Sequence, residues 1–229
     1  MRNSPRQRLM RLLAAMSPER VWRPVAAPDG EILSPGFGHD EDGPYSLPES
    51  VDFTGKTVLD LGCNFGEAVF FALSRGAVRA DGVDSDPQAV EGARILAEWR
   101  GAKNAHFHTA DFLDAPLGMT ADAVLLIDFI GKGVTVKGRL DAVLRVAGAA
   151  AKREIVATIR PIYALKELPG TDGERLAALY GRAFVRDGRF HLWEYMERFL
   201  APGWDARVLT GEAAMGKKYK YAVRLTRKA

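Results

Sequence analysis

The chain has 229 residues, more than the ~150 of a typical domain but within the range of one enlarged α/β domain. Hydrophobic residues make up 47% of the sequence and charged residues 27%, which excludes a disordered chain and a collagen-like repeat. The net charge of +3 is too small an excess to indicate nucleic acid binding by itself.

Residues 1–54 are predicted to form an N-terminal wrap or lid. Seven of the 12 prolines lie in the first 50 residues, and this punctuation precludes a long regular element. The spacing of apolar residues predicts a short amphipathic helix from about Arg6 to Met16. Arginines cluster in the same stretch, and such a cluster is one way to follow a phosphate backbone.

Residues 55–229 are predicted to form one α/β domain, because short apolar runs alternate there with helical patterns. The predicted strands lie at 57–61, 79–84, 106–111, 123–128 and 154–159. Helices are predicted at 67–74 and 139–150, and a third begins at Pro87 after the cap residue Asp86 and ends at Gly101. Right-handed crossovers then give a Rossmann-like, doubly wound sheet that is mostly parallel.

After Pro161 this alternation stops, and residues of about 161–204 are predicted to form a helical cap insertion, with helices near 173–186 and 191–200. Eight of the 21 aromatic residues fall in the cap, twice the average density. Ordinary packing of these rings is the favoured interpretation, and a wall for a planar acceptor is the alternative.

Two final strands near 206–210 and 218–226 are predicted to pair as an antiparallel hairpin, which brings the sheet to seven strands. Apolar and basic residues alternate along the second of them, a pattern typical of a half-buried edge strand whose lysines discourage aggregation. A nucleic acid groove is the alternative for this basic tail.

A turn rich in small residues follows the strand at 57–61, in the sequence VLDLGCNFG. A chain that passes sharply from strand to helix beside a ligand needs residues with little or no side chain, as at Gly62 and Gly66. Asn64 also accepts left-handed backbone geometry. The dinucleotide-binding pattern G-x-G-x-x-G would require glycine at 64 and 67, so a nicotinamide-dependent dehydrogenase is disfavoured.

Four acids lie at or near the carboxyl ends of predicted strands: Asp60, Asp84, Asp111 and Asp128. In open α/β sheets ligands bind beyond these ends. Four carboxylates on one rim would repel a pyrophosphate but suit a ligand that carries an ammonium group, a sulfonium and a ribose diol. This arrangement favours S-adenosylmethionine over NAD.

Over residues 55–160 the chain resembles the class I S-adenosylmethionine-dependent methyltransferases, whose first motif is met by the turn after Asp60. The resemblance implies S-adenosylmethionine as cofactor, with Asp84 on the ribose hydroxyls, Asp111 on the adenine amino group and the Phe112 backbone on the adenine ring. It also implies that Asp60 and the turn hold the methionine end. The implied cofactor-binding residues are Asp60, Gly62, Cys63, Asn64, Gly66, Asp84, Ser85, Asp111, Phe112 and Asp128.

A narrower likeness is carried by the sequence PDGEILSPG together with LDLGCNFG. In these segments the chain is similar to the subgroup that includes wobble-uridine-modifying tRNA methyltransferases and small-molecule relatives.

Catalytic residues are not identified from the sequence. Methyl transfer is an in-line displacement, so alignment of donor and acceptor supplies much of the acceleration, and a base is needed only for a protonated nucleophile. The candidate bases are Asp128, His39 and His191. No metal site is predicted, because His106 and His108 have no further ligand at suitable spacing.

The leading hypothesis is a methyltransferase that acts on a small molecule held between wrap and cap. An RNA methyltransferase that modifies tRNA and a non-catalytic interaction module are the alternatives. The lone cysteine, Cys63, forms no internal disulfide, and no apolar run reaches the ~18 residues of a membrane span, so we expect a cytoplasmic protein without a membrane partner. The oligomeric state is not predicted.

Overall fold

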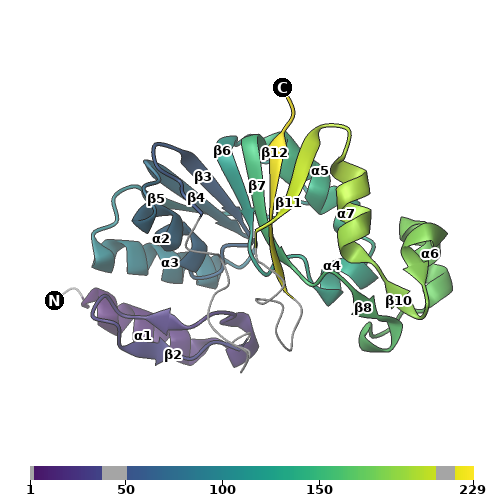
Figure 1. Ribbon diagram of the computed structural model, residues 1–229. Coiled ribbons are helices and arrows are strands. Elements are labelled where there is room, and N and C mark those ends of the chain that lie inside the picture. The colour runs from purple at the N-terminus through teal and green to yellow at the C-terminus, as the bar shows by residue number, and fades with distance from the viewer. Residues whose placement is uncertain (1–2, 38–50, 210–219) are drawn as a thin grey trace.

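The computed structural model describes residues 3–37, 51–209 and 220–229 (Figure 1). Its central sheet consists of β3 (Thr57–Leu61), β4 (Arg79–Asp84), β5 (Ala105–Thr109), β6 (Ala121–Leu126), β7 (Ala151–Ile159), β11 (Trp204–Val208) and β12 (Tyr221–Arg227). Their order in space is β11-β12-β7-β6-β3-β4-β5. The strands from β3 to β7 are parallel, whereas β12 is antiparallel to both β7 and β11. The predicted seven-stranded sheet, mostly parallel with a C-terminal antiparallel hairpin, is therefore confirmed.

Helices cover both faces of the sheet. One face packs against α2 (Glu67–Ser74) and α3 (Pro87–Arg100), and the other against α5 (Leu140–Ala150) and α7 (Leu192–Leu200). Successive residues of a strand point to opposite faces. Val58 therefore lies in the core cluster beneath α2 and α3, whereas Leu59 and Leu61 lie in the core cluster beneath α5 and α7. Both clusters are buried, which explains why β3 has apolar residues on both of its faces.

Helix α3 shows how closely local signals fix an element. The side chain of Asp86 accepts hydrogen bonds from the backbone N–H groups of Gln88 and Ala89, Pro87 occupies the first helical position, and Gly101 ends the helix with a φ of 64°. Each of these signals agrees with the sequence prediction.

The residues before the sheet, here called the arm (3–37), contain α1 (Pro5–Ala15), β1 (Val25–Ala26) and β2 (Ile32–Ser34). Ser4 and Gln7 form a capping box that starts α1. Figure 1 shows the arm, in purple, lying along α3. The apolar side chains of the arm form a third core cluster with the turn and with α3: Leu9, Met16, Val21 and Val25 with Phe65, Ala89, Ile95 and Leu96.

The cap segment (161–204) is less helical than predicted. Helix α6 (Gly173–Tyr180) ends at Tyr180 instead of residue 186, because Gly181 takes a φ of 97° that breaks the helix. The cap segment also contains a small antiparallel sheet, with the order β8 (Tyr163–Ala164), β10 (Arg189–Phe190), β9 (Val185–Arg186). These two-residue strands have too few residues to show a sequence period.

The aromatic rings of the cap segment contact one another, as the packing interpretation predicts. The ring of Tyr180 lies 5.0 Å from the rings of both Phe190 and Tyr195, measured between centroids. Most of this aromatic set therefore belongs to the core.

The prediction that residues 218–226 form an edge strand is wrong. Strand β12 lies between β7 and β11, so β11 is the edge, and Arg224 pairs with Glu154 of β7 instead of facing open solvent. Alternation along one strand reports which face is buried and carries no information about neighbours at its sides. Residues 218 and 219 fall outside the described residues.

Two predicted strands extend too far along the chain. Strand β5 ends at Thr109, and Asp111 instead accepts a hydrogen bond from the backbone of Leu113 in a turn. Strand β6 ends at Leu126, and Asp128 has a φ of 53° that no strand residue adopts. A short helix that the sequence reading did not predict, α4 (Lys132–Val136), follows β6.

Within the described ranges, no helix combines the length and the apolar character needed to cross a membrane.

Gly92→Ala is expected to destabilise the fold, although alanine is favoured over glycine in a helix by ~1 kcal/mol. A Cβ at position 92 would lie 2.2 Å from Cε1 of the buried Phe65 ring, so the ring or the backbone must shift at a cost of ~1–3 kcal/mol.

Gly148→Ala in α5 is the matched control, because the nearest atom to a Cβ there is Nε1 of Trp204 at 3.8 Å. This substitution should be neutral or slightly stabilising in urea denaturation. Equal effects of the two substitutions would contradict the packing argument.

Candidate functional site

The carboxyl ends of β3, β4, β6 and β7 open into a cleft with a volume of about 760 Å³. Its walls are formed mainly by the strand ends, by the arm, by α4 with the residues on either side of it, and by the start of the cap segment. The residues that line the cleft include Trp22, Phe37, Gly62, Asn64, Asp84, Leu113, Asp128, Phe129, Lys132, Lys137, Arg139, Thr158, Arg160, Tyr163 and Lys220.

The turn from β3 to α2 has three residues with positive φ: Gly62 at 84°, Asn64 at 45° and Gly66 at 83°. A Cβ at Gly62 would lie 2.2 Å from the Phe129 ring, and one at Gly66 would lie 2.6 Å from the Phe107 ring. Glycine is therefore required at both positions for steric reasons as well as conformational ones. The same geometry brings the backbone at Gly62 to the cleft surface.

Cys63 lies inside this turn and is buried. Burial, reinforced by the negative charges of Asp60 and Asp84, raises the pKa of its thiol. A thiol with a raised pKa is a poor nucleophile at neutral pH. The side chain of Cys63 therefore serves packing.

Asp84 ends β4 and lines the cleft. Its carboxylate accepts hydrogen bonds from the backbone N–H groups of Asn64 at 2.8 Å and Asp86 at 2.9 Å. Burial raises its pKa, and these backbone hydrogen bonds oppose the rise. A carboxylate has about four acceptor positions, so its backbone partners do not saturate the group.

Asp60 lies beneath the turn, is 2% exposed and does not line the cleft. Burial, together with the charges of Asp84 and Glu67, raises the pKa of its carboxyl to about 8. Near neutral pH the group is therefore largely protonated.

Asp128 lies at the end of β6 in a network of charged and polar groups. Its backbone N–H donates to Oγ1 of Thr158 at 2.7 Å, and the Thr158 hydroxyl donates to Oδ1 of Asp128 at 2.9 Å. Lys220 donates to the same oxygen at 3.2 Å, and Arg23 of the arm forms an ion pair with the carboxylate. Two cations thus compensate the negative charge of Asp128.

The four acids therefore do not form one free anionic rim. Asp84 and Asp128 line the cleft, Asp60 lies below it, and Asp111 is exposed outside the lining. The remaining predicted residues take different places: Ser85 is exposed, and Phe112 is buried with its ring 5.2 Å from that of Phe129. The neighbour of Phe112, Leu113, reaches the lining.

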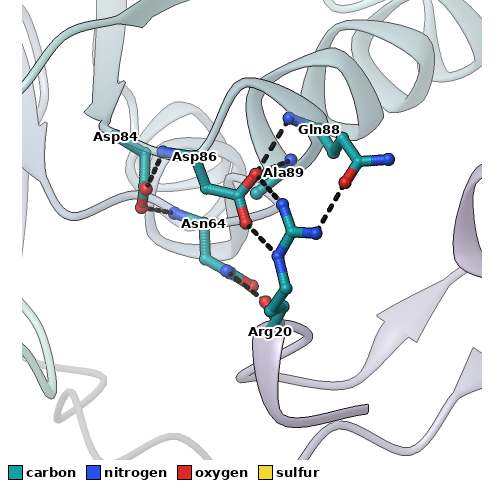
Figure 2. Close-up of polar contacts among 6 residues, drawn as sticks. All are labelled: Arg20, Asn64, Asp84, Asp86, Gln88 and Ala89. Atoms are coloured by element: carbon teal, nitrogen blue, oxygen red, sulfur yellow. Dashed lines mark hydrogen bonds and ion pairs between the residues drawn. The ribbon is translucent and has the colours of Figure 1, made fainter. Parts of the chain in front are cut away.

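The arm is attached directly to the turn through the side chain of Asn64. Its Nδ2 donates to the carbonyl of Arg20 at 2.8 Å, and its Oδ1 accepts from the backbone N–H of Trp22 at 3.1 Å. In Figure 2 the Arg20 guanidinium reaches α3, where it donates to both carboxylate oxygens of Asp86 at 2.6 and 2.9 Å and to Gln88 at 2.6 Å. The sequence reading missed these contacts, since they join residues more than 40 positions apart.

Most arginines of the arm pair with carboxylates of the same chain. Besides Arg20 and Arg23, Arg6 pairs with Glu31 at 2.8 Å and Arg8 with Glu98. The arginine cluster noted in the sequence is thus largely compensated within the protein, which weakens its interpretation as a phosphate-binding surface.

Of the three candidate bases, Asp128 alone is placed in the cleft among the residues that the structure describes. His191 lies outside the cleft lining, with Nδ1 3.1 Å from the carboxylate of Glu194. His39 falls outside the described residues.

The strand histidines take a different role from metal binding. Nε2 of His108 lies 2.9 Å from a carboxylate oxygen of Asp81. In residues 3–37, 51–209 and 220–229, no group of three or more histidine, cysteine or acidic side chains is arranged to hold a metal ion.

A sequence model of a protein family, described as "Methyltransferase domain", matches residues 52–187. Among curated proteins, the chain is similar to ribosomal protein L11 methyltransferases, with 42% identity over 114 residues to that of Escherichia coli (strain K12 / DH10B) and 36% over 112 residues to that of Edwardsiella ictaluri (strain 93-146). Each match covers 45% of this chain and 38% of the relative. The chain thus spans well under half the length of these relatives.

Solved structures show a similar fold. Magnesium protoporphyrin IX methyltransferase (ChlM) from Synechocystis PCC 6803, with bound SAH, is 20% identical with a TM-score of 0.53, over 77% of this chain and 76% of that one. The pyocyanin biosynthetic protein PhzM is 18% identical with a TM-score of 0.54, over 79% of this chain and 53% of that one.

Asn64→Gly is expected to loosen the arm without disturbing the sheet. Glycine retains the left-handed turn but removes both side-chain hydrogen bonds to the arm, each of which contributes ~0.5–1.5 kcal/mol. Hydrogen exchange measured by mass spectrometry should become faster in residues 5–37 and stay unchanged in the central strands. Unchanged exchange in the arm would show that Asn64 does not anchor it.

Asp60→Asn is expected to change how stability depends on pH. With a folded pKa of about 8, the Asp60 carboxyl of the wild type retains a proton that the unfolded chain releases near pH ~4. The unfolding free energy of the wild type therefore decreases as pH rises from ~4 to about 8, by at most ~5 kcal/mol. The variant lacks this group and should gain stability relative to the wild type as pH rises. Urea denaturation at about pH 5 and about pH 8 measures the difference, and a pH-independent difference would refute the raised pKa.

Proposed function

Because the chain belongs to the methyltransferase domain family, we propose that it is an S-adenosylmethionine-dependent methyltransferase that acts on a small-molecule acceptor. The observation that carries this proposal is one cleft in which the turn after β3, Asp84 and Asp128 face side chains of the arm and of the cap segment. Donor and acceptor would meet in that cleft.

Two features of the chain fit the cofactor. The backbone at Gly62 lines the cleft with no side chain in the way, which permits close approach of a ligand. Asp84 lines the cleft with a carboxylate that its backbone partners do not saturate, and a ribose diol offers donors to such a group.

The residues that the sequence resemblance implies would each contact a different part of the cofactor. Asp84 would accept the ribose hydroxyls, with Ser85 beside it. Asp111 and the Phe112 backbone would receive the adenine, beyond the lining residue Leu113. The segment from Gly62 to Gly66 would hold the methionine end, and the buried carboxyl of Asp60 would support that turn from below.

When bound, S-adenosylmethionine supplies a methyl group on a positively charged sulfur, which is open to in-line attack. The protein's part is then mainly to align the two reactants, and alignment can contribute ~7–11 kcal/mol. Asp128 already shares its charge with Arg23 and Lys220, so it is better suited to orient groups than to accept a proton.

The size and walls of the cleft favour a small acceptor. Its volume of about 760 Å³ falls within the range of small-molecule sites, which is roughly 300–1,000 Å³. The pairing of arm arginines with carboxylates speaks against the RNA alternative. The chain covers only 38% of the L11 methyltransferases that it resembles, so their acceptor does not carry over to this chain.

Asp84→Asn should weaken binding of S-adenosylhomocysteine, the demethylated cofactor, by ten-fold or more in titration calorimetry. The substitution removes the charge that strengthens hydrogen bonds to the ribose, and such bonds contribute ~1.5–3 kcal/mol each. Asp205→Asn is the control of equal charge change, since this side chain is 77% exposed on β11. Unchanged affinity in a variant that melts like the wild type would overturn the proposed role.

A further inference from the structure

The cleft has more cationic than anionic side chains. Five cations line it, Lys132, Lys137, Arg139, Arg160 and Lys220, against the two acids Asp84 and Asp128. This distribution differs from the acid-rich rim expected from the sequence. All of these cations except Lys220 come from the part of the chain between the end of β6 and the cap segment.

Two of the five cations are already paired. Lys220 contacts Asp128 at 3.2 Å, and Arg160 contacts Glu167 at 3.4 Å. For Lys132, Lys137 and Arg139, no ion pair forms with any other residue in the described parts of the chain. Their three positive charges fall within eight consecutive residues.

The segment that bears these charges is firmly held. Thr135 of α4 is fully buried, and the hydroxyl of Tyr180 donates to its backbone carbonyl at 2.7 Å, which ties α4 to α6. Lys132 and Lys137, at the two ends of α4, remain exposed and line the cleft. The charges are thus presented on a fixed support, an arrangement that lowers the entropic cost of binding.

Apolar surface lies in the same cleft. Trp22 and Phe37 of the arm are 41% and 62% exposed, and their ring centroids are 6.3 Å apart. Tyr163 is the one aromatic side chain of the cap segment in the lining. Exposed rings beside a concave surface typically contact a ligand with an apolar body.

We propose that the methyl acceptor is an amphipathic anion, a small molecule with a ring-bearing apolar body and a carboxylate or phosphate group bound by Lys132, Lys137 and Arg139. This inference rests on the proposed function, because it names the substrate class of the same cleft. Lysine and arginine bind both anions through charge-assisted hydrogen bonds. The rings of the arm would contact the apolar body.

Three probes of one shape test the proposal: 1-naphthoate, 1-naphthyl phosphate and the uncharged 1-naphthamide. Each is titrated calorimetrically into the full chain with S-adenosylhomocysteine present. At least one of the two anions should bind about ten-fold more tightly than the amide, and the stronger of the two identifies the preferred anionic group.

Lys132→Gln, Lys137→Gln and Arg139→Gln, combined in one variant, should reduce the affinity for the anions to that for the amide and leave the amide unaffected. The control variant, Lys103→Gln with Lys152→Gln and Arg153→Gln, removes the same charge from exposed positions outside the cleft and should retain the preference. If the triple variant does not fold, each single substitution should produce part of the loss of affinity for the anions.

Equal binding of the anions and the amide, no binding of any probe at millimolar concentration, or equal losses in both triple variants would overturn the proposal. Binding of single-stranded RNA in the same titration, without binding of the two anions, would overturn it in favour of a nucleic acid acceptor. Titration with S-adenosylhomocysteine alone tests the proposed function separately. If the protein does not bind S-adenosylhomocysteine, the affinities for 1-naphthoate and 1-naphthamide can still be compared in the protein without it.

Discussion

The chain leaves strand β3 through a turn in which Gly62, Asn64 and Gly66 have positive φ angles, and the rest of the candidate site depends on this geometry. Added side chains at the two glycines would collide with the rings of Phe129 and Phe107. The turn therefore fixes both the packing of the sheet end and the bare backbone that faces the cleft. Because Asn64 supports the turn and binds the arm, one residue connects the turn after β3 to the arm.

Local sequence signals predicted the part of the fold that surrounds this turn. The bounds of β3, α2 and β4 agree with the prediction residue for residue, because glycines, a cap residue and apolar runs delimit each element. The family match likewise confirms the methyltransferase resemblance that was read from Asp60 to Gly66. Signals of this kind depend on residues close together in the sequence, and the turn after β3 is such a local structure.

Features that depend on distant residues were not predictable. The ion pairs of Arg20 with Asp86, which the sequence indicated only as a helix cap, and of Arg23 with Asp128 join acids of the sheet region to cations from the arm. The cationic side of the cleft was missed for a related reason: the sequence GKGVTVKGR after Asp128 shows the charges, but only the fold brings them to the cleft. The position of β12 inside the sheet was also missed, since a strand's own alternation does not reveal its neighbours.

The position of β12 has a consequence for biosynthesis. During translation, residues 204–208 emerge before residues 221–227, yet β11 joins the sheet only through β12. Until the later segment has left the ribosome, β7 presents an unpaired row of backbone groups at the open side of a parallel sheet. Such rows recruit strands from other chains. Nascent molecules therefore expose the edge of β7 to other chains until β12 is available.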